Sequence, residues 1–559
     1  MISFYIFLLI FFLEATTILN REYVFFLYSL IPVFYYLEKE FKKETIFLPV
    51  KVFIAYFLFI IFSFFSFYFS VDRINTIDHL FFYAAVFFVL IIAFNEKEKI
   101  LKNFKKILVV LGGVFCLFSL LPKEIFWPTA YQLIFPLYPN HNHLGDFLGM
   151  VLIWLLYDWI NKNNKKDLLT LFIFLPFFIF SFSRSAYVDF LIIASFIFFK
   201  NRNLKNQKKK IVLSLLTGIF LVFVFTQKEI YQAPLLNNFL PKIAQSLNFE
   251  PRSFFSQRPE YFRQGIKGFL EKPFFGWGLG NYIYPSQKYV NQNLNQVFSA
   301  LSLPITILAE VGIFGFVLFL FFIILVIKEI NFQRKPIYFL FFYLTLNFLT
   351  DYTYSIYGLF LFWFLLIGLS INHKKTAQIN LYPIFSLGVL IFIFLKINGA
   401  IFTQLGLPQV GFYFFPFSHQ SFQGIINQKI NKGEIISAKK FAQNYYKNSS
   451  MSFSALVFLT DFYENLGEKK QAVFFAQKLT DNNRFPPFNA LKKTYQLKKE
   501  IEGEKQANNY FLKFFEDFKT VFWMNKAFEA EVFDFCFKEN IIYCRYRYYN
   551  PPAGKGIEK

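Results

Sequence analysis

Charged side chains stand close to the ends of long apolar runs in this sequence. Arg184 lies in SFSRSAYV, shortly after the run LFIFLPFFIF, and Asp351 directly follows the run YFLFFYLTLNFLT. A guanidinium is always charged and is costly to place in hydrocarbon, so an arginine at such a position needs a reason. Fixed guanidiniums can stabilise a phosphate group that gains negative charge during a reaction.

The other candidates for chemistry lie in and beside two segments between apolar runs. YPNHNHLGD supplies amides and imidazoles, QRPEYFRQGIKGF supplies guanidiniums, and an indole and a carboxylate follow in GWGLGN and ITILAEVG. An imidazole or a carboxylate can serve as a general base, while guanidiniums suit anionic groups. These candidates are Asn140, His141, Asn142, His143, Asp146, Arg258, Arg263, Trp277 and Glu310.

Each of these residues also has a purely structural explanation. Arg184 could extend its guanidinium to lipid phosphates. Arg263 and Lys267 share one helical face beside an apolar stripe, which favours a helix lying along the membrane surface. His141 and His143 could be ordinary loop residues. The two acids, Glu310 and Asp351, could cap helices or pair within a helical bundle.

Several kinds of site have no support in the sequence. GWGLGN at 276–281 has the glycines of a phosphate loop, but it neither follows a strand nor opens a helix in a βαβ unit. We find no spacing typical of metal ligands, no supported Ser–His–Asp pattern and no nucleotide-binding cassette. We therefore expect no metal and no cofactor.

Composition indicates a protein with many membrane spans. Of 559 residues, 55% are hydrophobic and 17% are charged, and 89 are Phe. A soluble protein of this length could not bury so much apolar surface, whereas stretches of roughly 17–25 apolar residues can cross a bilayer as helices. Thirteen such spans are expected, at approximately 2–19, 23–37, 46–70, 77–94, 106–121, 143–160, 168–183, 185–199, 211–226, 303–327, 336–350, 355–371 and 381–399.

The lysines and arginines predict the topology. Alternate loops, beginning with EKEFKKET, together hold 22 Lys and Arg, whereas the short loops between them hold four. The positive-inside rule then places the N-terminus in the cytoplasm and everything after the last span outside. It also places the long loop 227–302 and Arg184 outside. Lysine-rich cytoplasmic loops explain the net charge of +22, so we expect no binding of nucleic acid.

The residues after about 400 form a separate region. We expect a linker at 401–432, a helical domain at 433–545 and a disordered tail at 546–559. The piece SALVFLTDFYENLGEKKQAVFFAQKL is similar to a tetratricopeptide helix–turn–helix, and a generic helical bundle is the alternative. Cys536 and Cys544 could pair in an oxidising compartment or remain buried thiols.

Five segments, in order, resemble those of the O-antigen ligase and polymerase-like superfamily. They are YPNHNHLGDFLGM, SFSRSAYV, RPEYFRQGIKGFLEKPFFGWGLGNY, ILAEVGIFGFVLFL and DYTYSIYGLFLFWFLLIGL, and the resemblance covers roughly residues 80–370. It implies an all-α polytopic protein of the bacterial cytoplasmic membrane with about 12–13 transmembrane helices. The membrane domain would occupy 1–400, followed by the extracytoplasmic tetratricopeptide-like domain.

The resemblance also implies an activity. Members of the superfamily transfer a glycan from an undecaprenyl-diphosphate carrier to a lipid core, a growing polysaccharide or a protein hydroxyl, with inversion and without a metal. Arg184 and Arg258 match arginines of the family and would act on the diphosphate. Asn140, Asn142, Arg263, Trp277 and Asp351 would contact substrate, and the helical domain could bind a protein partner.

The chain departs from the family pattern at one position. Members commonly place a His-Asn pair about nine residues before the Glu of AEVG, but Leu301 and Ser302 stand there, and residues 227–302 contain no histidine. His141, His143 or Glu310 could supply the base instead. Alternatively, the reaction needs no strong base, or activity has been lost.

Two other classes of protein would fit parts of this pattern. A transporter or flippase of lipid-linked glycans would be expected to carry internal repeats and polar spans at mid-membrane, whereas most charges here lie at span ends. A membrane scaffold that displays the helical domain would not require the outward arginines. The choice among ligase, polymerase and protein glycosylation is left open by the sequence.

Overall fold

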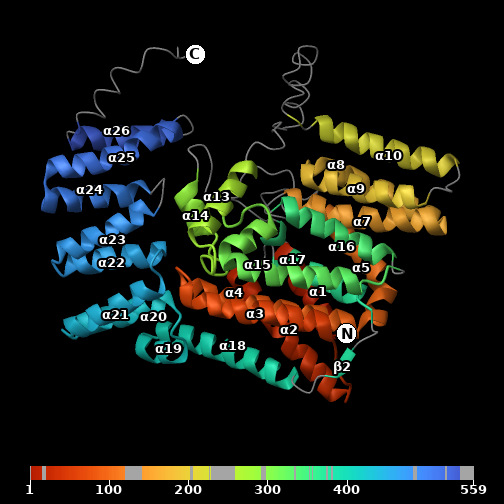
Figure 1. The fold of residues 1–559 in the computed structure, drawn as a ribbon, viewed down its shortest axis with the longest axis horizontal. Helices are drawn as coiled ribbons and strands as arrows, with labels where there is room; N and C mark the ends of the chain where they lie inside the picture. Colours follow the sequence, from red (N-terminus) through yellow and green to blue (C-terminus); the bar gives the residue numbers. More distant parts are fainter. Residues whose placement is uncertain are drawn as a thin grey trace, which may run out of the picture.

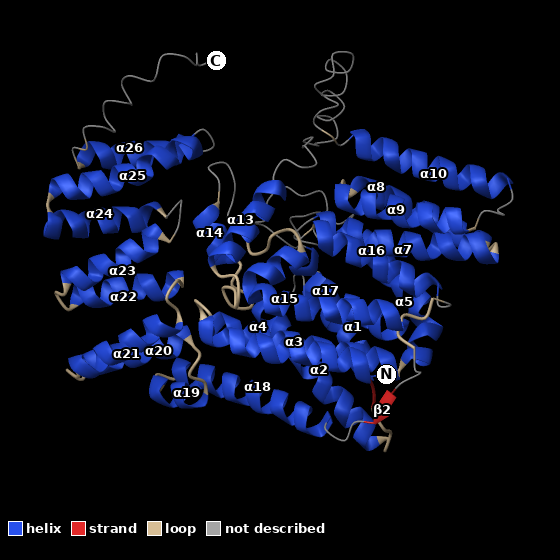
Figure 2. Ribbon diagram, in the orientation of Figure 1, coloured by secondary structure: helices blue, strands red, loops and turns tan. Residues whose placement is uncertain are grey.

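The described part of the chain is helical nearly throughout (Figure 2). The computed structural model describes residues 2–15, 21–119, 141–201, 206–225, 227, 258–290, 297–332, 335–351, 353–355, 357–372, 376–378, 382–482, 487–522, 526–539 and 541. Two three-residue strands, β1 (Phe47–Pro49) and β2 (Thr376–Gln378), pair antiparallel with Phe47 opposite Gln378. The predicted all-α class is otherwise confirmed.

A helix occupies each of the thirteen predicted spans, because backbone polar groups in hydrocarbon must be satisfied within the segment. Five described helices are long and apolar enough to cross a bilayer: α3, α4, α15, most of α7 and the second part of α18. Apolar parts of α1, α16 and α17 are shorter. The helices are α1 (Ile2–Ala15), α2 (Arg21–Phe41), α3 (Val50–Phe69), α4 (Arg73–Asn95), α5 (Lys97–Ser119), α7 (His141–Lys162), α8 (Lys165–Phe180), α9 (Arg184–Lys200), α10 (Asn206–Phe225), α15 (Leu303–Glu329), α16 (Lys335–Thr350), α17 (Tyr357–Ser370) and α18 (Tyr382–Gln404).

The membrane domain is a bundle built around α17. Every residue from Gly358 to Ser370 is buried, and α17 packs against α4 and α16. In Figure 1 the bundle extends from α18 at its lower edge to α10 at its upper edge. α3, α15 and α18 leave much of their apolar surface uncovered, as expected of helices that face lipid.

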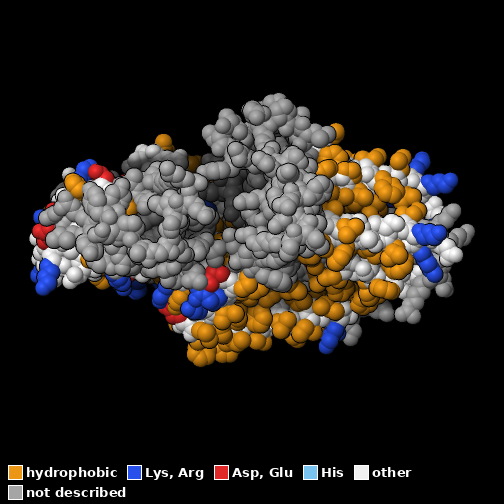
Figure 3. Space-filling model, turned by 90° about the horizontal axis from the view of Figure 1, so that it is seen from above, with side chains coloured by type: hydrophobic (Ala, Val, Ile, Leu, Met, Phe, Trp, Pro, Cys, Tyr) orange, Lys and Arg blue, Asp and Glu red, His pale blue; other side chains and the backbone are white. Residues whose placement is uncertain are grey.

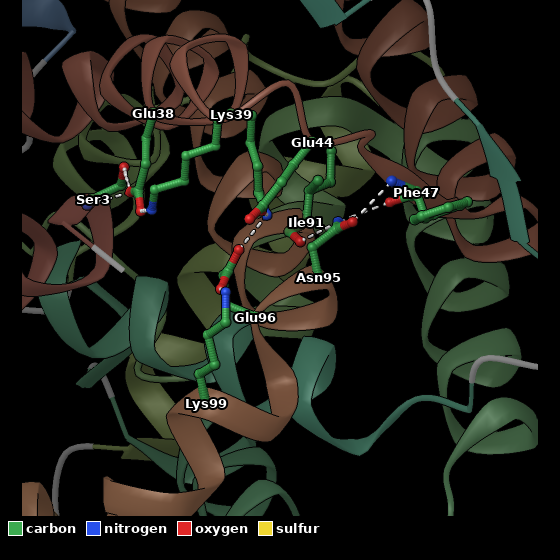
Figure 4. A network of polar contacts seen from close by, with 10 residues as sticks. Ser3, Glu38, Lys39, Glu44, Phe47, Ile91, Asn95, Glu96 and Lys99 are labelled. Atoms are coloured by element: carbon green, nitrogen blue, oxygen red, sulfur yellow. Dashed lines mark hydrogen bonds and ion pairs between the residues drawn. The ribbon is translucent and has the colours of Figure 1, made fainter.

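One end of the bundle gathers the lysine-rich loops, and we call it the lysine end. There Lys39 and Lys99 both pair with the buried Glu96, the latter at 3.0 Å (Figure 4). Lys105 lies 2.8 Å from Asp158 and 2.7 Å from Asp167, which joins α5, α7 and α8. Figure 3 shows hydrophobic side chains over the visible face of the membrane domain and Lys and Arg at this end.

We call the opposite end of the bundle the site end, because it holds the start of α4, α7, α9 and α15. The alternation of loops between the two ends agrees with the predicted topology. Which end faces the cytoplasm stays a prediction that rests on the lysine count. Two further helices lie at the site end, α13 (Arg258–Glu271) and α14 (Ile283–Tyr289).

The helices after α18 stack as antiparallel pairs beside the site end (Figure 1). Glycines with positive φ end the first helix of three pairs, at Gly433, Gly467 and Gly503, which are 34 and 36 residues apart. The first spacing equals the tetratricopeptide period of 34 and the second is two residues longer, and the tetratricopeptide-like identity stays a prediction. The helices are α19 (Pro408–Phe414), α20 (His419–Asn431), α21 (Ile435–Asn448), α22 (Phe453–Asn465), α23 (Lys469–Asp481), α24 (Phe488–Glu502), α25 (Glu504–Phe522) and α26 (Lys526–Lys538).

The expected linker at 401–432 is largely helical. It contains α19 and α20, and Phe422 of α20 shares a core with Ala442 of α21. We therefore propose that the helical domain begins near residue 408, because Phe412 of α19 already packs against the same core. Cys536 is buried, while Cys544 and the expected tail at 546–559 lie outside the described residues.

We predict that Gly368→Ala destabilises the bundle. A Cβ at Gly368 of α17 would lie 2.3 Å from the Leu90 carbonyl oxygen of α4, and backbone cannot move aside cheaply. Overpacking of this kind removes about 1–3 kcal/mol of stability, measurable as a lower Tm in detergent. Gly388→Ala in α18, where a Cβ meets nothing within 4 Å, is the matched control. Equal Tm values for the two variants would contradict the central packing of α17.

Candidate functional site

An arginine–aspartate pair lies at the site end. Arg258, the first residue of α13, donates from Nη2 to Asp351 Oδ2 at 3.0 Å. The Ser185 hydroxyl donates to the same carboxylate oxygen at 2.6 Å. Asp351 is 1% exposed, and the Arg258 side chain is 14% exposed. The pair therefore fixes a guanidinium in a largely dry position, where it acts more strongly on an anion than it would in water.

A second set of hydrogen bonds holds Asp146 beside this pair. Thr353, two residues after Asp351, donates to Asp146 Oδ2 at 2.6 Å. The Asn347 amide donates to Asp146 Oδ1 at 2.8 Å and to Asp189 Oδ2 at 3.1 Å. Because these residues come from α7, α9, α16 and the turn after α16, the amide of Asn347 ties three helices together.

His143 lies beside the hydrogen-bonded residues of the two preceding paragraphs, which we call the cluster. Its Nδ1 atom lies 4.0 Å from Asp146 Oδ2, one helical turn away on α7, and the imidazole is 1% exposed. This distance is too long for a hydrogen bond but short enough for a favourable interaction with an imidazolium. The imidazole therefore lies beside an acidic side chain whose two oxygens also accept hydrogen bonds from Thr353 and Asn347.

The turn between α8 and α9 positions Arg184. Ser183 caps α9 by accepting a hydrogen bond from the Ala186 N–H at 3.4 Å, and Phe182 adopts a positive φ of 49° to make the turn. A Cβ on Gly145 would lie 2.6 Å from the Ser181 hydroxyl, so α7 packs directly on this turn. Arg184 is half-buried and directly precedes Ser185, whose hydroxyl bonds Asp351, so its backbone lies close to the carboxylate that holds Arg258.

Glu310 and the GWGLGN segment interlock. Glu310 is 4% exposed, and its Oε1 atom accepts the Tyr282 N–H at 3.2 Å. Its carbonyl oxygen accepts the Gly278 N–H at 2.8 Å. Gly276 and Gly312 both have positive φ, and a Cβ on either would lie within 2.4 Å of the backbone of the other segment. This placement favours an anchoring carboxylate over a general base.

Trp277 and Arg263 belong to residues 258–290, the stretch that contains α13 and α14 and that we call the outer segment. The indole of Trp277 is 1% exposed and donates from Nε1 to the Gly268 carbonyl at 2.8 Å, and Lys272 lies 4.8 Å from the ring centre. Partial burial lowers the pKa of Lys272. Arg263 pairs with Glu260 and donates to a backbone carbonyl. These contacts connect the parts of the segment to one another and leave the ring of Trp277 little surface for substrate.

The remaining candidates are placed only in part. Asn140 lies outside the described residues, and His141 opens α7. Asn142 is half-buried next to His143. In the part of the chain that the structure describes, no group of three or more His, Cys, Asp and Glu is arranged to hold a metal ion.

Four polar residues of the cluster were not predicted from the sequence to be site residues. Asp189 and Asn347 stand inside apolar runs, and an ionisable or amide side chain there is itself a signal of function or pairing. Ser185 and Thr353 are common residue types, and their local sequence gives no comparable signal. Their part in the cluster follows from helix packing.

The fold and the cluster define a multi-pass membrane protein with buried polar groups and an arginine–aspartate pair at one end of its bundle. Residues 169–320 match the family model Wzy_C, described as O-antigen ligase. The match covers a little over a quarter of the chain and includes Arg184, Arg258 and Glu310. It confirms the resemblance to the O-antigen ligase-like superfamily. No curated protein matches the chain.

We predict different effects for two substitutions of Glu310. Glu310→Gln keeps an oxygen that can accept the Tyr282 N–H, so stability should stay near that of the wild type. Glu310→Ala leaves this buried N–H unsatisfied and should remove about 1–3 kcal/mol. Thermal unfolding of the purified chain in detergent measures both effects. If Gln destabilises as much as Ala, the charge itself is needed and the anchoring role is wrong.

Proposed function

We propose that this chain transfers a glycan from an undecaprenyl-diphosphate-linked donor to an acceptor at the outer face of the bacterial cytoplasmic membrane. The family match supports glycan transfer in the assembly of cell-envelope polysaccharide. The observation that carries the proposal is the pair of arginines at the site end. Arg258 is oriented by Asp351, and the Ser185 that shares this carboxylate is the neighbour of Arg184.

In the proposed reaction an acceptor hydroxyl oxygen attacks the anomeric carbon of the donor sugar. The bond from that carbon to the diphosphate oxygen breaks, and undecaprenyl diphosphate leaves with the electron pair. Arg184 and Arg258 stabilise the negative charge that develops on the leaving group. The acceptor proton passes to a base on the protein, and the anomeric configuration inverts. The lipid diphosphate is itself the leaving group, so the residues need no nucleotide sugar.

We propose His143 as that base. His143 lies 4.0 Å from Asp146 at the site end and directly follows the half-buried Asn142, near the start of α7. Glu310 is a weaker candidate, since backbone N–H groups already occupy its carboxylate. The proposal keeps Asn140, Asn142, Asp351 and the half-buried surface around Arg184 as the region where substrate binds.

Orientation and partners complete the proposal. The lysine count supports a cytoplasmic N-terminus and an extracytoplasmic helical domain. The acceptor is a lipid core, a growing polysaccharide or a protein hydroxyl, and the helical domain offers a surface for a protein partner.

The proposal predicts that both arginines are required. After deletion of the gene, complementation with Arg258→Ala or Arg184→Ala should leave envelope glycans defective, with transfer lowered by about 10²–10³-fold per arginine. Lys267→Ala is the control, because Lys267 is an exposed cation on the same helix as Arg258. Unchanged glycans on deletion, or full rescue by both arginine variants, would refute transfer.

The proposed base predicts a change in the pH dependence. His143→Gln should lower kcat by about 10²–10⁴-fold and remove the acid limb of the pH–rate profile, because no imidazole remains to lose a proton. Glu310→Gln, by contrast, should keep that limb. A purified chain with a synthetic lipid-linked donor allows the measurement. An unchanged profile for His143→Gln would assign the base elsewhere.

A further inference from the structure

Asp72, at the start of α4, is shared by three parts of the chain. Its Oδ2 atom accepts the Tyr284 hydroxyl at 2.7 Å, and Tyr284 belongs to α14 of the outer segment. Its Oδ1 atom accepts the Ser449 hydroxyl at 2.9 Å, and Ser449 belongs to the helical domain. Asp72 is 3% exposed and also caps α4 by accepting the Asn75 N–H. Both oxygens of one buried carboxylate thus hold the outer segment and the helical domain to the bundle.

The contact with Tyr284 reaches Arg258 through packed helices. In α14, Ser286 donates to Gln264 of α13 at 2.9 Å. The adjoining Tyr282 donates to the Tyr261 carbonyl of α13 at 2.8 Å. A Cβ on Gly268 of α13 would lie 2.5 Å from Pro285, so the two helices are in close contact. Arg258 is the first residue of α13, so a displacement of α14 would act on the helix that carries its guanidinium.

Asn281 provides a further link between the outer segment and the loop before α4. Its amide lies within hydrogen-bonding distance of four oxygens, which include the Ser70 hydroxyl at 2.8 Å and the Asp72 carbonyl at 3.1 Å. The Asn75 side chain donates in turn to the Gly280 carbonyl at 2.8 Å. The loop before α4 therefore holds the GWGLGN segment as well as Tyr284.

The helical domain is fixed at this loop by more than one hydroxyl. Ser449 forms a backbone bridge with Asp72, and Ser450 donates to the Val71 carbonyl at 3.3 Å. Ile74 of α4 is part of the helical domain's own core. Any force that moves the helical domain at 449–451 therefore acts directly on Asp72.

We propose that Asp72 is a positioning residue for Arg258, and that the helical domain, through Ser449, is part of the structure that holds this arginine in place. The effect of Asp72 on catalysis rests on the proposed transfer reaction. The coupling between the helical domain and α13 does not depend on that reaction. In this proposal, binding of a partner to the helical domain changes the position of Arg258 at the site.

The physical reason is the cost of an unsatisfied buried carboxylate. Loss of the Tyr284 hydroxyl removes the bond to Asp72 Oδ2 in a nearly dry position, and loss of the Ser449 hydroxyl leaves Oδ1 with the longer bond from the Asn75 N–H at 3.3 Å. In each case the segment on that side is held less firmly. Burial and the neighbouring carboxylate raise the pKa of Tyr284 well above its ordinary value, so its hydroxyl stays a donor at physiological pH.

Hydrogen exchange of the full-length chain in lipid nanodiscs tests this. Tyr284→Phe and Ser449→Ala each remove one hydroxyl from Asp72 and keep the packing. Exchange of the amides in α13 and α14 should rise about fivefold in each variant. Ser454→Ala in the helical domain, whose hydroxyl accepts from Gln423 and does not contact Asp72, is the matched control and should leave this exchange unchanged.

Transfer kinetics on the same proteins give the second readout. Tyr284→Phe and Ser449→Ala should lower kcat with little change in KM for the acceptor, because they misplace Arg258 without removing a substrate contact. If the wild-type chain transfers no glycan but the two variants show faster exchange, the coupling is supported and the proposed function is refuted. Wild-type exchange in α13 and α14 of both variants would overturn the positioning role, as would equal kcat values.

Discussion

Hydrocarbon offers no hydrogen-bonding partner, so each buried polar group at the site end must find one inside the protein. The contact on which most of the site depends is the one between Arg258 and Asp351, which joins α13 to the end of α16. Ser185 extends it to α9, and Thr353 and Asn347 extend it to α7. Removing one partner would leave a buried charge, which is far more costly than removing a surface pair.

The outer segment is held by a different kind of constraint, close backbone contact. At Gly276 and Gly312 the chain needs both a positive φ and the absence of a side chain, because each glycine lies against the other segment's backbone. This close contact explains why PFFGWGLGN needs glycine at position 276 and AEVGIFG needs glycine at position 312. Together with the contact between Asp72 and Tyr284, it holds the segment that carries α13 and α14 against the bundle.

Much of the fold was predictable because its signals are local. Apolar runs of span length marked the helices, and alternating lysines marked the two ends of the bundle. The paired helices after α18 had a signal that a single repeat did not reveal, namely the spacing of Gly433, Gly467 and Gly503. The early start of the helical domain was not predicted, because α20 has the composition of a linker and becomes part of a domain only by packing on α21.

For the site, the sequence by itself determined which residue types were present and that Arg184, Arg258 and Asp351 would lie at one end of the bundle. The positions of charged residues and the lengths of apolar spans are enough to predict this, because both are local features of the sequence. Only the tertiary structure decided that Asp351 holds Arg258, that Glu310 serves the backbone of the outer segment, and that Asp72 joins the helical domain to α14. Those outcomes depend on hydrogen bonds between residues far apart in sequence, whose geometry exists only once the helices have packed.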